Sequence, residues 1–259
     1  MRVLLTDGSG LTSRQVATRL SISGHVVEVL TPDPLALTRF TRHVRRTHRV
    51  PPYGADPFAW LEAALGVYKA GHFDVLFPTQ EQVAVLARSE DRLRSLGVAT
   101  AVPSFDALVR VQDKLAAFAT LGALDIPQPR AAVLTTPDEL TRWESVPAFV
   151  KTPIGTATTG VRFVTEQAEL STLASVWGDA GVFSDGGVLV QSPVEGQLIM
   201  VQSVFFEGRM VASHANLRVR EGVSGSASHK EGVDLPDVRE HLTLLGGRLG
   251  WHGALSADA

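Results

Sequence analysis

The first hundred residues alternate short apolar runs with amphipathic stretches. Residues 3–5, 26–30 and 74–78 are apolar runs of strand length. The stretch after the first run and residues 58–70 repeat apolar side chains at helical spacing. Strands that alternate with helices in this way predict a parallel sheet covered on both faces. We therefore expect residues 1–105 to form a Rossmann-like α/β domain.

The pattern changes after residue 105 to an α+β one. Residues 199–206 and 209–217 predict an antiparallel hairpin that turns at Glu207-Gly208. Residues 222–232 are rich in Gly and Ser and predict a loop. The remaining helices are expected at 113–124, 137–143, 166–177 and 236–249, and the remaining strands at 148–151, 161–165, 188–191 and 253–258.

Composition limits the classes of function. A hydrophobic content of 44% with 20% charged residues is typical of a globular chain. The net charge of −3 argues against wholesale binding of nucleic acid or an acidic membrane. The absence of cysteine excludes disulfides, cysteine-ligated metals and thiol catalysis. No signal peptide and no apolar run of about 18 residues is present, so we expect a cytoplasmic protein.

A glycine-containing turn, Gly8-Ser9-Gly10, follows the first predicted strand. A dinucleotide fingerprint needs a third glycine at the position of Ser13, so a tight strand-to-helix turn is the favoured interpretation. A small anionic ligand at the helix N-terminus is an intermediate possibility. A dinucleotide-dependent oxidoreductase that uses this domain stays open as an alternative.

One basic run lies in residues 39–49, with Phe40 as its single aromatic residue, and no base-stacking surface is expected. A solvated helix face is the favoured interpretation, and a phosphate or carboxylate contact is the alternative. The eight histidines contain no i, i+4 pair with an acid between them, which gives little support for a histidine metal site. The run consists of Arg39, Arg42, His43, Arg45, Arg46, His48 and Arg49.

The strongest signal is a series of four features in the second half. Gln112-Asp113-Lys114 opens a helix that ends at Ile126-Pro127-Gln128-Pro129. A strand then ends at Lys151, and a Gly/Thr loop follows over residues 155–160. The last feature is the strand 188–191, which runs into a linker that includes Gln197.

Each feature can serve the binding of a nucleoside triphosphate. Lys114 and Lys151 can supply compact cations, and only four of the 24 basic residues are lysine. The loop 155–160 can close over phosphates, because its glycines permit close backbone approach and its threonines donate hydrogen bonds. The backbone of 191–194 can read an adenine edge, since a proline interrupts strand pairing there, and Gln197 can meet the ribose.

This ordered set resembles the ATP-grasp superfamily, and more narrowly its carbamoyl-phosphate-synthase-like and carboxylate–amine ligase members. The resemblance implies an α/β plus α+β fold. Residues 1–105 would be a Rossmann-like preATP-grasp domain, 106–186 the first ATP-grasp subdomain and 187–259 an incomplete second one. It also implies ATP and Mg²⁺ as cofactors, and a small-molecule carboxylate and amine as partners, with no nucleic acid and no membrane.

The resemblance assigns a role to each candidate residue. Arg218 or Arg220 would face the reacting acyl phosphate, and the turn in the first domain would contact substrate. The remaining assignments are Lys114 and Lys151 for the phosphates, Gly155, Thr156, Thr158, Thr159 and Gly160 for the phosphate flap, Gln191, Ser192 and Val194 for the adenine hinge, Gln197 for the ribose, and Gly8, Ser9 and Gly10 for the substrate.

Two departures from the family pattern affect these expectations. Gln197 stands where many members carry Glu, so the ribose contact would be neutral. In the family, a strand after the one that begins near Gly253 bears a Glu and an Asn that hold magnesium. Asp258 is the only acid near that place, so we expect a C-terminally truncated chain with little or no ligase activity. An unpaired strand near Asp258 also predicts a homodimer.

The expected reaction is attack of a carboxylate on the γ-phosphate of ATP, followed by capture of the acyl phosphate by an amine or another nucleophile. The alternative is a non-catalytic nucleotide-binding or scaffold protein with the same fold.

Overall fold

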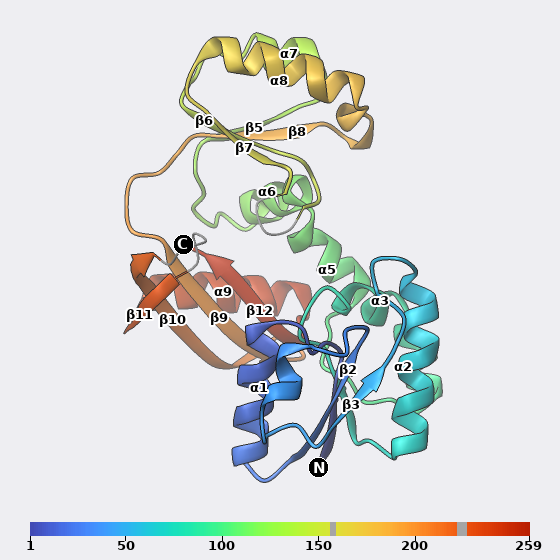
Figure 1. The fold of residues 1–259 in the computed structure, drawn as a ribbon. Coiled ribbons are helices and arrows are strands. Elements are labelled where there is room, and N and C mark those ends of the chain that lie inside the picture. Colours follow the sequence, from blue (N-terminus) through green and yellow to red (C-terminus); the bar gives the residue numbers. More distant parts are fainter. Residues whose placement is uncertain (156–158, 222–226) are drawn as a thin grey trace. The chain divides into compact units, whose positions relative to one another are not determined.

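The computed structural model describes residues 1–155, 159–221 and 227–259 (Figure 1). Within these residues the strands form three four-stranded sheets. The chain divides into two compact units. The first consists of Met1–Phe105 with the short segments Val204–Glu207 and Gly250–Ala254, and the second contains the rest. No helix of the described residues is long and apolar enough to cross a membrane.

The first unit contains a parallel sheet with the strand order β3-β2-β1-β4, as the alternating pattern predicted. A short 3₁₀ turn, Leu37–Phe40, lies between two of its strands. The other elements are β1 (Arg2–Leu5), α1 (Leu11–Ile22), β2 (Val26–Thr31), β3 (Arg46–Arg49), α2 (Pro57–Gly71), β4 (Val75–Phe77), α3 (Val83–Arg88) and α4 (Glu90–Ser95).

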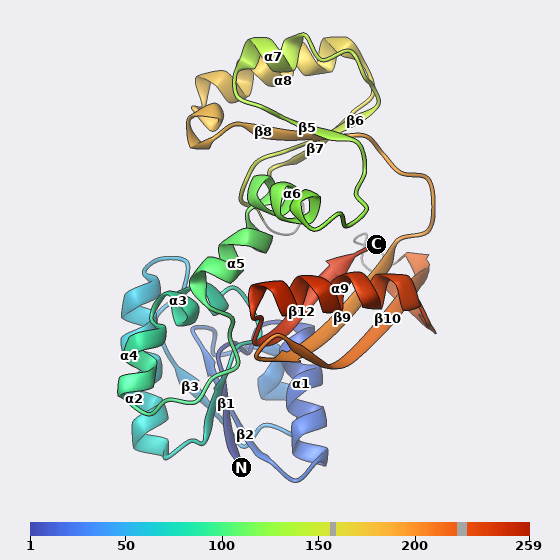
Figure 2. The ribbon, with the colours of Figure 1, turned by 180° about the vertical axis from the view of Figure 1, so that it is seen from behind.

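Helices α1 and α2 lie on opposite sides of this sheet (Figures 1 and 2). Val3 and Leu5 of β1 pack with Val27 and Val29 of β2 against Ala17 of α1. Because side chains alternate along a strand, the intervening positions of β1 and β2 face the α2 side. The sheet therefore has two apolar faces, which explains why its central strands are continuous apolar runs.

The prediction of a solvated helix in the basic run is wrong. Arg46–Arg49 form β3, an edge strand that pairs with β2 in the register Glu28↔Arg46 and Leu30↔His48. An edge strand leaves much of its surface to solvent, so charged side chains are tolerated there and also protect against unwanted pairing. The apolar pattern that marks a buried strand is missing for the same reason.

The second unit begins with two helices that precede a sheet of order β5-β8-β6-β7, in which every pairing is antiparallel. From here to the end of the chain the elements are α5 (Phe105–Gln112), α6 (Lys114–Ala123), β5 (Ala131–Leu134), α7 (Pro137–Thr141), β6 (Ala148–Lys151), β7 (Val161–Val164), α8 (Gln167–Asp179), a 3₁₀ turn (Val182–Asp185), β8 (Val188–Gln191), β9 (Ile199–Phe206), β10 (Arg209–Glu221), β11 (Ala227–Val233), α9 (Pro236–Leu249) and β12 (Gly253–Asp258).

Helices α7 and α8 cover one face of this sheet, and α6 lies on the other side (Figures 1 and 2). Val150 of β6 and Val190 of β8 pack with Leu140, Leu170 and Trp177 of the two covering helices. Strand β8 thus lies within this sheet, which differs from the predicted division that placed everything from residue 187 onward in the following subdomain. Its two buried valines complete the core between β5 and β6.

The last sheet has the order β11-β10-β9-β12. Its β9–β10 hairpin is confirmed, and Glu207 (φ 48°) and Gly208 (φ 82°) give the two positive φ angles of a type I′ turn. The predicted loop over 222–232 is wrong in its second part, because Ala227–Val233 form β11. This polar strand is held by backbone pairing with β10, so it carries no apolar signal. Residues 222–226 lie outside the described residues.

Candidate functional site

Lys114 is the first residue of α6, and the residue before it fixes its position. The Asp113 carboxylate accepts hydrogen bonds from the backbone N–H groups of Leu115 (2.8 Å) and Ala116 (3.1 Å), which is an N-cap. The backbone N–H of Lys114 donates to the carbonyl of Pro153 (2.9 Å). Its Nζ donates to the carbonyl of Gly155 (3.2 Å). Both ends of this lysine therefore contact the segment that follows β6.

Lys151 is placed by the alternation of side chains along β6. Ala148 and Val150 are buried in the core under α7 and α8. Lys151 therefore points to the opposite face, where its Nζ donates to Oε1 of Gln191 at 2.6 Å. Lys151 pairs with Leu189, so Gln191 is its diagonal neighbour on β8. The structure thus brings together two residues that the sequence predicted for one site.

The two lysines form a partly buried positive pair. Burial, and then the charge of Lys114, lower the pKa of Lys151, while Asp258 acts in the opposite direction. Burial also lowers the pKa of Lys114, against the influence of Asp113. Asp113 is used as a helix cap, and the hydrogen bond of Lys151 goes to a neutral amide. An anion placed here would lower the energy of both ammonium groups.

The two ends of the loop that follows Lys151 lie close together. The N–H of Thr152 donates to the carbonyl of Gly160 at 2.8 Å. A Cβ on Gly155 would lie 2.1 Å from the carbonyl oxygen of Thr159, and a Cβ on Gly160 would lie 2.1 Å from Oγ1 of Thr152. Both glycines are therefore needed for the close approach of the loop ends. The other two predicted threonines of the loop, Thr156 and Thr158, lie outside the described residues.

The predicted adenine hinge begins where β8 ends. The backbone N–H of Ser192 donates to the carbonyl of Arg130 at 2.8 Å, so this donor is already used within the chain. Val194 is 71% exposed and Gln197 is also exposed. The backbone between Gln191, the last residue of β8, and Ile199, the first residue of β9, lies outside the sheets. The hinge and ribose roles stay predictions.

An aromatic pair beside Lys151 was missed by sequence reasoning. The rings of Phe149 and Phe163 lie 4.7 Å apart, and they share a face of the sheet because these two residues pair directly. The Nζ of Lys151 lies 5.7 Å from the centre of the Phe149 ring. Phe163 is 52% exposed, which gives an apolar surface next to the ammonium groups. The available signal was the spacing of two residues between Phe149 and Lys151 on one strand.

Arg218 and Arg220 lie on β10, opposite basic residues of β11. Arg218 is paired with Lys230 and Arg220 with His229, with irregularities in the register between them. Arg218 thus has a second cationic residue, Lys230, directly opposite it across the ladder. Lys230 and His229 were not predicted, because the sequence pattern gave no strand there. A role of the two arginines toward an acyl phosphate stays a prediction.

The turn at Gly8-Ser9-Gly10 makes hydrogen bonds with Asp7 and with Thr38 of the first unit. The N–H and hydroxyl of Ser9 both donate to Oδ2 of Asp7, at 2.8 and 2.7 Å. The carbonyl of Gly8 accepts from the N–H and Oγ1 of Thr38, at 3.1 and 3.0 Å. A Cβ on Gly8 would lie 2.4 Å from Thr38 Oγ1, so close packing explains this glycine. The substrate role of Gly8, Ser9 and Gly10 stays a prediction.

The described residues do not fit a resident magnesium ion. They contain no group of three or more His, Cys, Asp or Glu that could hold a metal. Asp258, the predicted ligand, is exposed, and its charge raises the pKa of Lys151. Magnesium prefers several oxygen ligands in octahedral geometry, and one carboxylate does not supply them.

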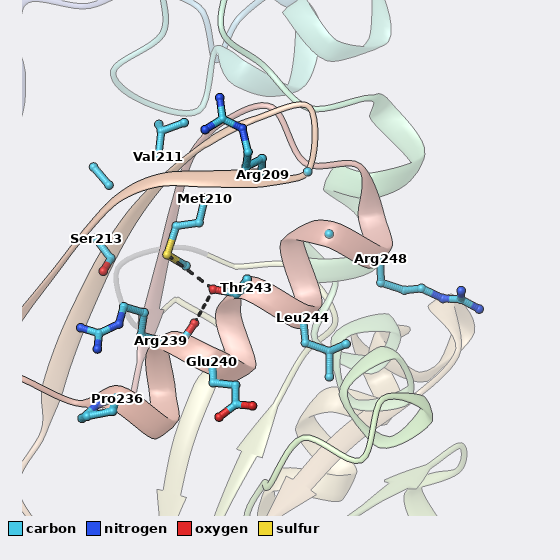
Figure 3. A pocket seen from close by; sticks show the side chains of 13 residues that line it. Arg209, Met210, Val211, Ser213, Pro236, Arg239, Glu240, Thr243, Leu244 and Arg248 are labelled. Carbon is cyan, nitrogen blue, oxygen red and sulfur yellow. Dashed lines mark hydrogen bonds between the residues drawn. The ribbon is translucent and has the colours of Figure 1, made fainter.

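A cavity of about 1060 Å³ lies between β10 and α9 (Figure 3). The hydroxyl of Thr243 on α9 donates to the carbonyl of Arg239 (2.7 Å) and lies 3.7 Å from the sulfur of Met210 on β10. None of the predicted site residues lines this cavity. It is therefore separate from the lysine pair.

The fold is similar to that of several solved enzymes. The L-amino acid ligase from Bacillus licheniformis has a TM-score of 0.69 at 14% identity, over 100% of this chain and 63% of that chain. The biotin carboxylase domain of the Hydrogenobacter thermophilus 2-oxoglutarate carboxylase, solved as a dimer with MgADP, ADP and bicarbonate, has a TM-score of 0.75 at 14% identity, over 99% and 60%. The N5-carboxyaminoimidazole synthetase from Staphylococcus aureus, in complex with ADP, has a TM-score of 0.69 at 13% identity, over 99% and 65%.

The chain has the ATP-grasp fold. This confirms the fold that the ordered motifs implied. The chain spans about 60–65% of the length of the three ATP-grasp structures above. No protein-family model and no curated protein sequence matches it. At 13–14% identity, the ATP-grasp likeness carries the fold, while the roles of individual residues rest on the geometry described above.

Proposed function

We propose that the chain binds ATP and is the nucleotide-binding part of a carboxylate–amine ligase. The lysine pair carries this proposal. Lys114 and Lys151 are two partly buried ammonium groups whose charges repel, and the only side-chain hydrogen bond described for Lys151 goes to a neutral amide. A polyphosphate is the ligand that such a pair favours, since it brings several negative charges to compact cations.

Neighbouring groups hold the two lysines in position. Gln191 holds the ammonium group of Lys151 at the end of β6, and the Asp113 cap holds Lys114 at the start of α6. The two phosphate-binding groups are thus fixed before the ligand arrives, which lowers the entropy lost on binding. The apolar surface of Phe149 and Phe163 beside them suits the base or the ribose face of a nucleotide.

The proposed reaction has two displacements. A carboxylate oxygen attacks the γ-phosphorus, the bond from that phosphorus to the β–γ bridging oxygen breaks, and ADP leaves. An amine nitrogen then attacks the acyl carbon, inorganic phosphate leaves, and the nitrogen loses a proton. Lys114 and Lys151 would stabilise the negative charge that moves onto ADP, and Arg218 or Arg220 the charge on the acyl phosphate. The described residues hold no site for magnesium, so no part of this reaction is assigned to a metal ion.

The test is calorimetric titration of ATP into the wild-type chain and into Lys114→Ala and Lys151→Ala. We expect loss of detectable binding in Lys151→Ala and clear weakening in Lys114→Ala. Lys69→Ala is the matched control, because Lys69 is an exposed lysine of α2 outside the site. Unchanged affinity in both site variants would refute the assignment.

The non-catalytic alternative is separated by turnover. If ATP binds through the lysine pair, ADP release in the presence of mixed carboxylates and amines indicates the ligase reaction. ATP binding without any ADP release would favour a nucleotide-binding protein that does not catalyse.

A further inference from the structure

A second cavity, in the first unit, has a basic lining. It has a volume of about 910 Å³ and lies between the sheet near its β3 edge and the C-terminal part of α2. Ligand pockets of proteins commonly have about 300–1,000 Å³. We call it the arginine cavity. It is lined by Arg2, Glu28, Arg45, Arg46, His48, Gly66, Val67, Ala70, Gly71 and His72.

The charges of the arginine cavity do not balance. Glu28 is its single carboxylate and is only 5% exposed. Both of its oxygens are taken, Oε1 by Arg2 at 3.0 Å and Oε2 by His48 at 2.7 Å. Arg45 and Arg46 have no acidic partner among the described residues. Three arginines against one glutamate therefore give the lining a formal net positive charge.

The wall of the cavity is fixed in place. Arg2 donates through Nε to the carbonyl of Gly71 at 3.0 Å, and its guanidinium lies 5.0 Å from the centre of the Phe73 ring. His48 contacts the same ring edge-on, with the ring centres 6.1 Å apart. The contact with Gly71 also covers a carbonyl at the C-terminal end of α2, which would otherwise repel an anion. A preorganised wall of this kind binds ligands with a smaller loss of entropy.

Small residues of α2, namely Gly66, Ala70 and Gly71, line one side of the cavity. Gly66 lies inside the helix, where glycine destabilises relative to alanine. A Cβ on Gly66 would meet no atom within 4 Å, so no contact within the described residues requires a glycine there. A ligand that lies against the helix at this point would require it.

We propose that the arginine cavity binds a small molecule that carries a phosphate group. Arg45 and Arg46 would contact the phosphate oxygens, since guanidinium groups match phosphate with paired hydrogen bonds, and Arg2 would provide a third cation. Glu28 would position Arg2 and His48. The room beside Gly66 would take the rest of the molecule. This site uses none of the residues assigned to ATP and does not depend on the function proposed for them.

The experiment is calorimetric titration of inorganic phosphate, inorganic pyrophosphate and ribose 5-phosphate into the Lys114→Ala/Lys151→Ala chain, which removes the other phosphate-binding groups. We expect binding to persist there, and to weaken by at least about tenfold when Arg45→Ala/Arg46→Ala is added. Arg42→Ala is the matched control, because Arg42 is an exposed arginine of the same basic run that does not line the cavity.

A second variant separates a shaped site from diffuse charge attraction. Gly66→Leu keeps every charge, and its side chain enters open space, so it should fold normally and block the ligand. Loss of ribose 5-phosphate binding in Gly66→Leu supports the proposal. Equal weakening by Arg42→Ala and by the double arginine change, or malonate binding as tight as phosphate, would overturn it. So would absence of binding by all three phosphate probes.

Discussion

Replacing Lys151 by methionine should separate the stability of the sheet from the binding of nucleotide. Methionine keeps the length of the side chain and removes the charge. In the free protein, burial and the charge of Lys114 both disfavour the ammonium form of Lys151, so its removal relieves an unfavourable interaction. The change also removes the 2.6 Å hydrogen bond to Gln191, whose amide is only partly buried and can turn to water. These effects oppose each other, and we expect the free energy of unfolding to change by less than about 1 kcal/mol.

The effect on binding is expected to be much larger. A hydrogen bond that involves a charged group contributes about 1.5–3 kcal/mol. Loss of one ammonium–phosphate contact of this kind weakens binding by about 10- to 150-fold, because each 1.4 kcal/mol is about a factor of ten. The predicted signature is therefore a chain of nearly wild-type stability whose affinity for ATP is about 10- to 150-fold lower.

Urea unfolding without nucleotide, followed by tryptophan fluorescence, measures the first quantity, and calorimetric titration of ATP measures the second. Lys69→Met serves as the control for loss of one exposed lysine. The reasoning fails if Lys151→Met unfolds more easily by over about 2 kcal/mol while ATP affinity is retained, because Lys151 would then be a structural residue.

Three further results are expected. Burial lowers the pKa of Lys114 and of Lys151 in the free chain, and a bound phosphate would raise both pKa values again. The affinity for ATP should therefore be full at pH values below the two free-chain pKa values and should fall as the pH rises through them, before it reaches the ordinary lysine value of 10.5. An ATP affinity that stays constant up to pH 10.5 would contradict this. Gly8→Ala places a Cβ 2.4 Å from Oγ1 of Thr38 and should destabilise the chain by about 1–3 kcal/mol in thermal unfolding, and an unchanged melting temperature would show that the turn relaxes. Among the described residues β12 is an end strand of its sheet, so sedimentation should detect a dimer formed through that edge, and a monomer at all micromolar concentrations would exclude it.

The sequence predicted the placement of the candidate residues best where a candidate residue and core residues share one strand. The apolar positions of β6 and β8 fix their register, and the alternation then places Lys151 and Gln191 on the same free face. The cap formed by Asp113 was readable in the same way, because an aspartate before an apolar helix is a recognised start signal. The cap depends on neighbours close in sequence, whereas the meeting of Lys151 and Gln191 also needs the pairing of β6 with β8.

The features that sequence reasoning missed depend on long-range pairing. The strands β3 and β11 are polar, since both lie at sheet edges, and only the partner strand shows that they are strands. The arginine cavity joins Glu28, His48 and Gly66 from three separate elements. The run of arginines was visible in the sequence, but its pairing with β2 and its position opposite a helical glycine were not.

The opposite faces of β6 constrain how the gene can change. Val150 enters the core under α7 and α8, and the next residue carries the ammonium group. Insertion or deletion of one codon within this strand would turn the lysine inward and a valine outward, which harms folding and binding in a single event. Insertions and deletions in related chains should therefore accumulate in the connecting segments. Selection for a well-packed core also keeps the orientation of Lys151, even where the ammonium group itself is not selected.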